Sequence, residues 1–460
     1  MKLAGPKTPH WLNIIQYISN PLGFLEKTAS RYGDTFTLSG SLSTTDSRTV
    51  VVVSHPKALK QVFTRPQDIT SPGELHQAMA PFIGENSLLL IDGSRHRHRR
   101  KLLRPSFHGK CLYDYGRSIC EITEKIVNSY SPNQTFLAYD ALQEISLQII
   151  LETVLGLRQE GLRRQLRQRY VFYKKCVNSP LIPLVITVPI LRQDFGKWTP
   201  WGRFLYAKQQ INELIYVEIN KCRHQNDPSR TDILNTLISA RDESGETMTD
   251  DELCEDLRLM FFAGQEPPAT AVAWAIYWLH NHPEILEKLR KELDNLGTDA
   301  DPVNIAQLPY LTAVCNETMR ISPVIPFTSP RLAEVPIELM GYKLEANTIL
   351  ECCTYLTHQR EDLYPEPKKF RPERFLEREF TPYEFLPFGG GMRGCIAQPF
   401  AEYEIKLILA TLISRYEWQL LGQRPERYWV EGTILRPAKG VQIKRLKQRS
   451  RKSKNAAIYS

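Results

Sequence analysis

One cysteine in a glycine-rich stretch is the residue of this chain best suited to chemistry. The stretch from Phe388 to Ala397 reads FGGGMRGCIA, and its glycines let the backbone turn tightly and approach a flat, bulky group. Apolar residues at helical spacing follow over 396–416, so the thiol of Cys395 lies at or just before a helix N-terminus, which favours the thiolate. With Arg393 nearby as a cation, this thiolate suits an iron ligand better than a disulfide partner. A buried structural cysteine is the alternative interpretation.

A second candidate site lies in the middle of a long predicted helix. The sequence Thr249-Asp250-Asp251-Glu252 has the form of a capping box, and apolar positions continue the pattern to about His280. Glu266 and Thr270 are four residues apart on one face, so a carboxylate and a hydroxyl that could move protons lie together. A local hydrogen bond from Thr270 to its own helix is the alternative role.

Two prolines interrupt that helix directly after Glu266. A proline inside a helix removes one backbone hydrogen bond and costs about 3 kcal/mol. Pro267 and Pro268 therefore free the carbonyls of Ala263 and Gly264, and we expect a kink there that the helix tolerates.

A basic helix near the N-terminal quarter supplies a third set of polar groups. His96 and Arg100 share one face beside Leu102 and Leu103, and two donors on an inward face suit a buried dianion. The other cations of this helix are expected to form a solvated face; they are Arg95, Arg97, Arg99 and Lys101.

Together these stretches resemble the cytochrome P450 superfamily, in the same order and over nearly the whole chain. The cysteine loop matches F-x-x-G-x-R-x-C-x-G except that Ala397 replaces the last glycine, and the basic helix matches H-x-x-x-R. Further along, Glu317-Thr318-Met319-Arg320 matches E-x-x-R, and the segment 370–375 matches F-x-P-x-R-F. The resemblance implies a mainly α fold with a smaller β-rich region, and haem b, which is iron protoporphyrin IX, as the cofactor.

The resemblance also assigns roles to individual residues. It implies that Cys395 ligates the iron, with Phe388 and Arg393 around it, and that His96, Arg100 and Arg331 contact the haem propionates. A buried cluster of Glu317, Arg320 and Arg374 is expected to lock the core beneath the haem, and Glu266 and Thr270 are the catalytic candidates.

The resemblance implies a monooxygenase that hydroxylates an unactivated C–H bond of a fatty acid or terpenoid, using O2 and electrons from a ferredoxin and its reductase. Pro267 departs from the family pattern, because it stands where an alcohol that helps deliver protons is expected. A peroxygenase or hydroperoxide-using enzyme is therefore an alternative. A haem-binding protein without catalysis is the third hypothesis.

Composition agrees with a soluble globular protein. The chain has 460 residues, of which 42% are hydrophobic and 24% charged, and its nine cysteines show no metal-type spacing, which predicts reduced thiols in the cytoplasm. Of the net charge of +8, seven charges lie between Lys444 and Lys454. We therefore expect one catalytic domain over 1–443, β-rich over about 21–65, and a disordered basic tail over 444–460.

The remaining expectations concern partners. No motif supports nucleic-acid binding, and the expected state is a monomer. The apolar segment 181–191 reads as a lid over a hydrophobic substrate, as a peripheral membrane contact or as a plain core segment.

Overall fold

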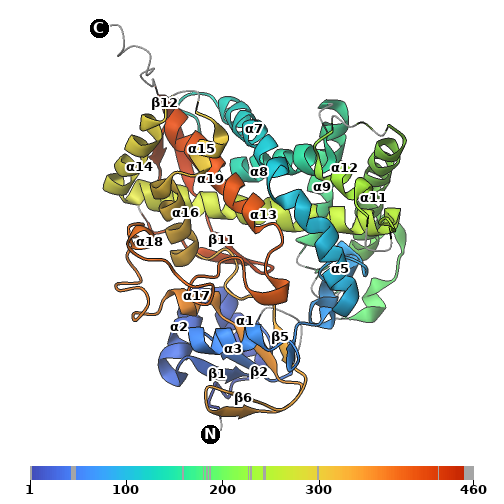
Figure 1. Ribbon diagram of the computed structural model, residues 1–460, viewed down its shortest axis with the longest axis vertical. Helices are drawn as coiled ribbons and strands as arrows, with labels where there is room; N and C mark the ends of the chain where they lie inside the picture. The colour runs from blue at the N-terminus through green and yellow to red at the C-terminus, as the bar shows by residue number, and fades with distance from the viewer. Residues whose placement is uncertain are drawn as a thin grey trace. The chain divides into compact units, whose positions relative to one another are not determined.

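The computed structural model describes residues 3–449, apart from 43–47, 158–159, 180, 183–184, 186–187, 226, 228–229, 242–244, 298–299 and 423. The chain is mostly helical with small sheets, as predicted (Figure 1). It divides into two compact units: unit 1 comprises residues 1–75, 115–145 and 266–460, and unit 2 comprises residues 76–114 and 146–265. Two boundaries fall inside α-helices, namely α8 (Ala138–Leu155) and α13 (Asp250–Asn281). The single domain expected from the sequence stays a prediction.

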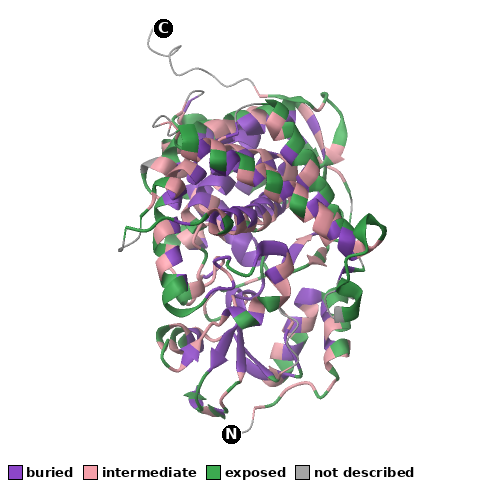
Figure 2. Ribbon diagram, turned by 90° about the vertical axis from the view of Figure 1, so that its right-hand side faces the viewer, coloured by how far each residue is buried: buried purple, intermediate pink, exposed green. Residues whose placement is uncertain are grey.

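Unit 1 holds a five-stranded sheet whose strands come from distant parts of the chain. Its order is β1-β2-β8-β5-β3, and β2 runs parallel to β8 while the other pairs are antiparallel. The strands are β1 (Thr35–Leu38), β2 (Val50–Val53), β3 (Ile69–Thr70), β5 (Arg331–Ala333) and β8 (Ile349–Cys352). Figure 2 shows the central strands as buried, which agrees with their run of β-branched residues. The β-rich N-terminal part predicted over 21–65 is therefore completed by strands from beyond residue 330.

Besides its parts of α8 and α13, unit 1 contains α-helices from several regions of the chain. They are α1 (His10–Ser19), α2 (Pro21–Tyr32), α3 (Pro56–Thr64), α7 (Gly116–Asn128), α14 (Pro283–Asn295), α15 (Pro302–Ala306), α16 (Pro309–Ile321), α17 (Thr354–His358), α18 (Arg374–Glu377) and α19 (Gln398–Arg415). Two hairpins also belong to the unit, β6 (Ile337–Leu339) with β7 (Tyr342–Leu344) and β10 (Tyr428–Glu431) with β11 (Ile434–Pro437).

The basic tail begins later than the sequence suggests. Strand β12 (Gln442–Gln448) lies between β4 (Thr135–Leu137) and β9 (Tyr416–Leu420) and is antiparallel to both. Arg445 is buried in this sheet and donates to the Asn128 side chain at 3.0 Å, and Arg449 pairs with Asp294 at 2.9 Å. The prediction of a disordered tail over 444–460 is thus wrong for 444–449, because residues distant in sequence bind this segment. Residues 450–460 lie outside the described residues.

Unit 2 is helical and is organised by the N-terminal half of α13. Its other α-helices are the part of α8 from residue 146 on, α4 (Ala80–Ile83), α5 (Gly93–Leu103), α6 (Lys110–Asp114), α9 (Glu160–Val177), α11 (Pro200–Gln225) and α12 (Ile233–Ser239). The predicted capping box starts α13, since the Thr249 hydroxyl accepts from the Glu252 backbone at 3.2 Å and the Glu252 carboxylate accepts from the Thr249 backbone at 3.1 Å. Part of the predicted lid, 183–184 and 186–187, lies outside the described residues.

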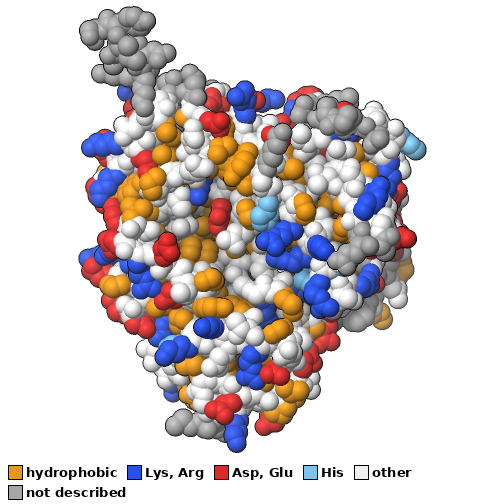
Figure 3. Space-filling view, in the orientation of Figure 1, with side chains coloured by type: hydrophobic (Ala, Val, Ile, Leu, Met, Phe, Trp, Pro, Cys, Tyr) orange, Lys and Arg blue, Asp and Glu red, His pale blue; other side chains and the backbone are white. Residues whose placement is uncertain are grey.

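The surface and the thiols agree with the composition. Acidic and basic side chains both lie on the face drawn in Figure 3, where several Lys and Arg side chains gather near the centre and right. All nine cysteines are free, as predicted. In the described part of the chain, no helix combines the length and the apolar character that crossing a bilayer requires.

Candidate functional site

The cysteine loop is a tight backbone turn that carries an exposed Cys395. The Cys395 backbone donates to the Phe388 carbonyl at 2.9 Å, which closes the loop, and the Cys395 residue itself is exposed. Helix α19 begins three residues later, with Ala397 as its N-cap. The loop thus places Cys395 just before a helix N-terminus, where the positive end of the helix dipole stabilises a thiolate.

The structure explains why a glycine is needed at each of the three consecutive positions of the loop. Gly389 and Gly391 have φ values of 72° and 66°, in the left-handed region that residues with a Cβ avoid. A Cβ on Gly390 would come within 2.9 Å of the Phe63 ring from α3. The sequence predicted a tight turn; the contact with Phe63 adds that the loop also packs closely against a neighbouring helix.

A buried arginine supports the same loop from β5. Arg331 is 4% exposed and donates to the Gly390 carbonyl at 2.7 Å and to the Ser71 hydroxyl at 3.1 Å. Arg393 donates to the Ser71 carbonyl at 3.1 Å, so two guanidinium groups lie near one another. Burial, and to a smaller extent Arg393, lowers the pKa of Arg331 to about 10. Within the described residues Arg331 meets neutral acceptors and no carboxylate, which is the environment that an anionic ligand would complete.

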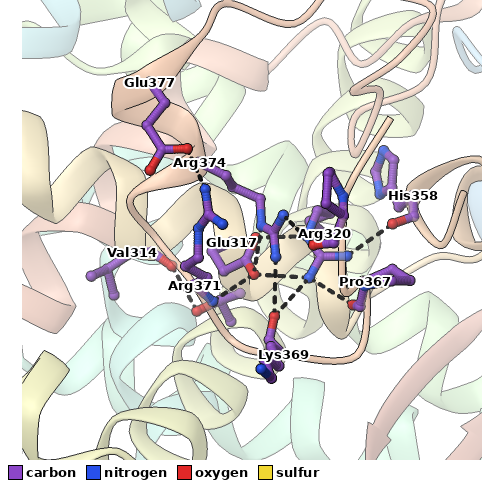
Figure 4. Close-up of polar contacts among 11 residues, drawn as sticks. Val314, Glu317, Arg320, His358, Pro367, Lys369, Arg371, Arg374 and Glu377 are labelled. Atoms are coloured by element: carbon purple, nitrogen blue, oxygen red, sulfur yellow. Dashed lines mark hydrogen bonds and ion pairs between the residues drawn. The ribbon is translucent and has the colours of Figure 1, made fainter. Parts of the chain in front are cut away.

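The charged cluster expected beneath the site is present and buried (Figure 4). Arg320 donates to both carboxylate oxygens of Glu317, at 2.6 and 2.8 Å, and Arg374 donates to the same carboxylate at 3.2 Å. The Arg371 backbone adds a fourth bond to this carboxylate at 2.8 Å. Arg320 also donates to the carbonyls of 358 and 367, both at 2.9 Å. Helix α16 is therefore bound to the irregular segment that leads to the cysteine loop.

His358 connects that cluster to the cysteine loop, a connection that the sequence did not reveal. Its carbonyl accepts from Arg320, and its Nε2 accepts from the Leu386 backbone at 3.0 Å, two residues before Phe388. Burial, followed by the charge of Arg320, lowers the pKa of His358 well below its usual range, so the ring stays neutral and can accept. The one feature of the sequence that could have indicated this connection is that His358 lies between the E-x-x-R motif and the cysteine loop.

Helix α13 continues through both prolines from Asp250 to Asn281. Pro268 has no N–H for the Gly264 carbonyl, and the Ser146 hydroxyl of α8 donates to that carbonyl at 3.4 Å instead. Gly264 lies close to α8, because a Cβ there would be 3.0 Å from Ile150. Ala263 is exposed although it lies in the middle of the helix, so one face of α13 is open beside the prolines.

The two catalytic candidates on α13 lie near a tyrosine that sequence reasoning missed. Burial, followed by the negative charge of Glu266, raises the pKa of Tyr139 on α8, while the nearby hydroxyl of Thr270 lowers it. Tyr139 therefore stays protonated and is a donor at neutral pH. Thr270 is fully buried and its hydroxyl lies on the side of α13 that faces Tyr139. The structure thus brings Glu266 and Thr270 to a common neighbour.

The basic helix α5 has a buried face that differs from the predicted one. His96 is buried and Arg100 half-buried, in line with an inward face. Arg99, however, is 4% exposed and pairs with Asp256 at 2.8 Å and with Glu252. Its predicted place on a solvated face is wrong, because α13 supplies two carboxylates that compensate its charge. The spacing of His96, Arg99 and Leu103 could have indicated one buried stripe.

These features fit a flat anionic cofactor that carries a metal. The exposed Cys395 offers a single soft ligand in a loop with three consecutive glycines, which leaves room for a planar group. The buried guanidinium of Arg331 offers the countercharge for a carboxylate. Both properties match haem, which a cysteine thiolate binds as an axial ligand.

Comparison with known proteins agrees with this chemistry. The cytochrome P450 family model matches residues 4–445. A putative cytochrome P450 135B1 of Mycobacterium bovis is 32% identical and covers 96% of this chain and 90% of its own. A putative cytochrome P450 135A1 of Mycobacterium tuberculosis is 30% identical over 97% of this chain and 95% of its own.

A solved structure shows the same fold. It is described as retinoic acid bound cyanobacterial CYP120A1, and it aligns with a TM-score of 0.82 over 98% of this chain and 100% of its own, at 24% identity. Together with the family match, this likeness confirms the mainly helical P450 fold. The chain belongs to the cytochrome P450 family, and it is a haem-thiolate monooxygenase.

Proposed function

We propose that this monooxygenase hydroxylates an unactivated C–H bond of a hydrophobic substrate, with O2 and with electrons from a separate protein. The observation that carries this proposal is Glu266, an acidic side chain next to the exposed Ala263 on α13 and near the protonated Tyr139. A carboxylate can take a proton from water and release it repeatedly, which O2 reduction requires. Glu266 thereby replaces the alcohol that Pro267 displaces.

The other residues would bind and orient the cofactor. Cys395 would ligate the iron, and haem held by a thiolate supplies the activation of O2, because the thiolate favours O–O cleavage. Arg331 and Arg393 would hold one side of the porphyrin near the loop, and His96 and Arg100 would contact its propionates. Phe388 would shield the sulfur, and the cluster of Glu317, Arg320 and Arg374 would hold the loop.

Thr270 has a narrower role in this proposal. Its buried hydroxyl lies near Tyr139, so the two hydroxyls can orient water next to Glu266. We therefore assign proton uptake to Glu266 and water orientation to Thr270.

We propose a ferredoxin and its reductase as electron donors and the cytoplasm as the location. A peripheral membrane contact remains part of the proposal, because Ile190 and Trp198 are 71% and 92% exposed on unit 2 and basic residues such as Lys197 accompany them. Nucleic acid is not an expected partner, and the protein is expected to act as a monomer.

The substrate class proposed is fatty acids and terpenoids. The retinoic acid named for the cyanobacterial structure is a terpenoid carboxylic acid, and it supports including that class in a test. Among the described residues, Ala263 is the exposed position in the middle of α13, and its apolar side chain suits an apolar substrate.

Use of peroxide instead of O2 is the second candidate, and Pro267 is the observation that favours it. An enzyme that starts from peroxide needs no relay of protons to reduced oxygen. Glu266 beside the prolines would, however, repel a fatty-acid carboxylate when ionised. We therefore rank hydroxylation with O2 first.

The test compares product formation from a panel of fatty acids and terpenes, retinoic acid included, under two conditions. One supplies ferredoxin, reductase, NADPH and O2, and the other supplies hydrogen peroxide alone. Faster product formation with the electron donors supports the proposal. If the Glu266→Gln variant loses this product formation but still forms product from peroxide at the wild-type rate, the role of Glu266 is supported as well. Faster product with peroxide alone contradicts the proposal and favours the second candidate.

A further inference from the structure

Within unit 2, a buried ion pair joins α5 to α13. Arg99 on α5 donates to Asp256 on α13 at 2.8 Å, and the two side chains are 5% and 1% exposed. Glu252, one turn earlier on α13, also pairs with Arg99. Burial raises the pKa of Asp256 to about 6, against the opposing effect of Arg99.

The same stretch of α13 holds the segment that precedes α5. The second oxygen of Asp256 accepts from the Leu88 backbone at 2.9 Å, and Glu255 accepts from the Asn86 backbone at 2.7 Å. Arg258 donates to the Phe82 carbonyl at 2.8 Å. Asp256 therefore belongs to a row of contacts that fixes where α5 begins as well as how it is rotated.

The rotation of α5 decides what its other polar residues face. His96, Arg99 and Leu103 are spaced by three and four residues and are all buried, so they form one stripe. Arg100 follows Arg99 directly, about 100° further around the helix. Fixing the guanidinium of Arg99 on α13 thus fixes the directions of His96 and Arg100.

A buried ion pair is a poor source of stability, because the desolvation of two charges offsets their attraction. Its strength is directional, since the planar guanidinium bonds a carboxylate in one geometry. If this pair only filled the space between α5 and α13, apolar side chains could replace it. Its fixed geometry therefore points to a role in orienting α5.

We infer that Arg99 and Asp256 are positioning residues for cofactor retention, which orient His96 and Arg100 toward the haem propionates. This inference rests on the proposed propionate contacts of His96 and Arg100. It assigns no contact with haem to Arg99 or Asp256 themselves.

The test is a double-mutant cycle on the rate of haem transfer from the holoprotein to apomyoglobin. Asp256→Asn should speed haem loss by about tenfold. In a background that carries both His96→Gln and Arg100→Gln, the same change should speed loss by less than about twofold, since the residues it orients are gone. In an Arg331→Gln background the effect should stay about tenfold, because Arg331 lies on β5.

Two further variants separate positioning from general loosening. Glu255→Gln is the matched control, because Glu255 is the neighbouring carboxylate that bonds Asn86 and not Arg99; we expect less than a twofold change. Arg99→Lys keeps the charge but loses the planar fork, and we expect haem loss between wild type and Asp256→Asn. Arg99→Lys also tests the inference if the Asp256→Asn variant does not fold well enough to be purified.

The outcomes distinguish the inference from the function on which it rests. Equal effects of Asp256→Asn in wild type and in the His96→Gln, Arg100→Gln background would overturn the inference, since the pair would then act on the fold as a whole. If His96→Gln with Arg100→Gln leaves haem loss unchanged, the proposed propionate contacts fail, and the inference fails with them. Hydroxylation of substrate by the wild type would stand in either case.

Discussion

Replacing Glu317 by glutamine tests a cluster of fully buried charges. The carboxylate accepts four hydrogen bonds, two from Arg320, one from Arg374 and one from the Arg371 backbone. Glutamine has nearly the same shape but no charge, and its amide nitrogen cannot accept from a guanidinium. The variant therefore leaves two buried guanidinium groups without an anion.

The expected magnitude follows from this burial. The side chains of Glu317 and Arg320 are 0% exposed and that of Arg374 is 3% exposed, so solvent cannot compensate the lost charge. Breaking a buried ion pair by removing one partner costs about 3–5 kcal/mol. Since a folded domain is stable by only about 5–15 kcal/mol, this is a large fraction of the whole.

The assay is urea unfolding of the holoprotein, followed by far-UV circular dichroism. Glu417→Gln is the matched control: Glu417 pairs at 3.6 Å with Lys447, whose side chain is 69% exposed, and such a pair contributes about 0–1 kcal/mol. Because His358 joins the cluster to the cysteine loop, Glu317→Gln should also lower the fraction of reduced carbon monoxide complex with a thiolate spectrum. A destabilisation below about 1 kcal/mol, equal to that of the control, would refute the reasoning.

Two further predictions concern α13 and His358. Pro267→Thr restores an alcohol beside Glu266 and should raise the fraction of consumed O2 that appears as product; unchanged coupling, measured as product per O2, would count against the proton-delivery reasoning. The pKa of His358 is lower in the folded state than in the unfolded chain, so its contribution to stability is present above about pH 6.5 and is lost as pH falls. His358→Gln should therefore weaken the loss of stability between pH 7 and 5, seen as urea midpoints at both pH values; an identical pH dependence would contradict the assigned neutral ring.

The elements around local motifs could be predicted from the sequence, and those built from distant partners could not. The capping box at 249–252 and the glycine loop before Cys395 depend on neighbouring residues, so their patterns are readable. Strand β12 forms by pairing with β4, which lies hundreds of residues earlier, and with β9, which lies tens of residues earlier. The basic composition of 444–449 gave no sign of this pairing and suggested a tail instead. The same limit applies to the five-stranded sheet of unit 1: β1 and β2 lie within the β-rich part predicted over 21–65, whereas β3, β5 and β8 lie outside it.

The candidate site shows the same division between residue identity and surroundings. The order of Glu317, Arg320 and Arg374 predicted a cluster, and the structure brings the three together. Arg99 was misplaced because its partner Asp256 lies 157 residues away and nothing local marks the pair. Tyr139 was missed since a tyrosine at the start of an amphipathic helix is ordinarily a packing residue.

The measurement that tests the central claim most directly is the carbon monoxide difference spectrum of the reduced protein. We compare wild type with Cys395→Ser and with Cys111→Ser, a half-buried thiol on α6 that has no assigned role. Loss of the thiolate-type Soret band in Cys395→Ser alone is the predicted result. A band that survives in Cys395→Ser, or that disappears in Cys111→Ser, would contradict the assignment of Cys395 as the iron ligand.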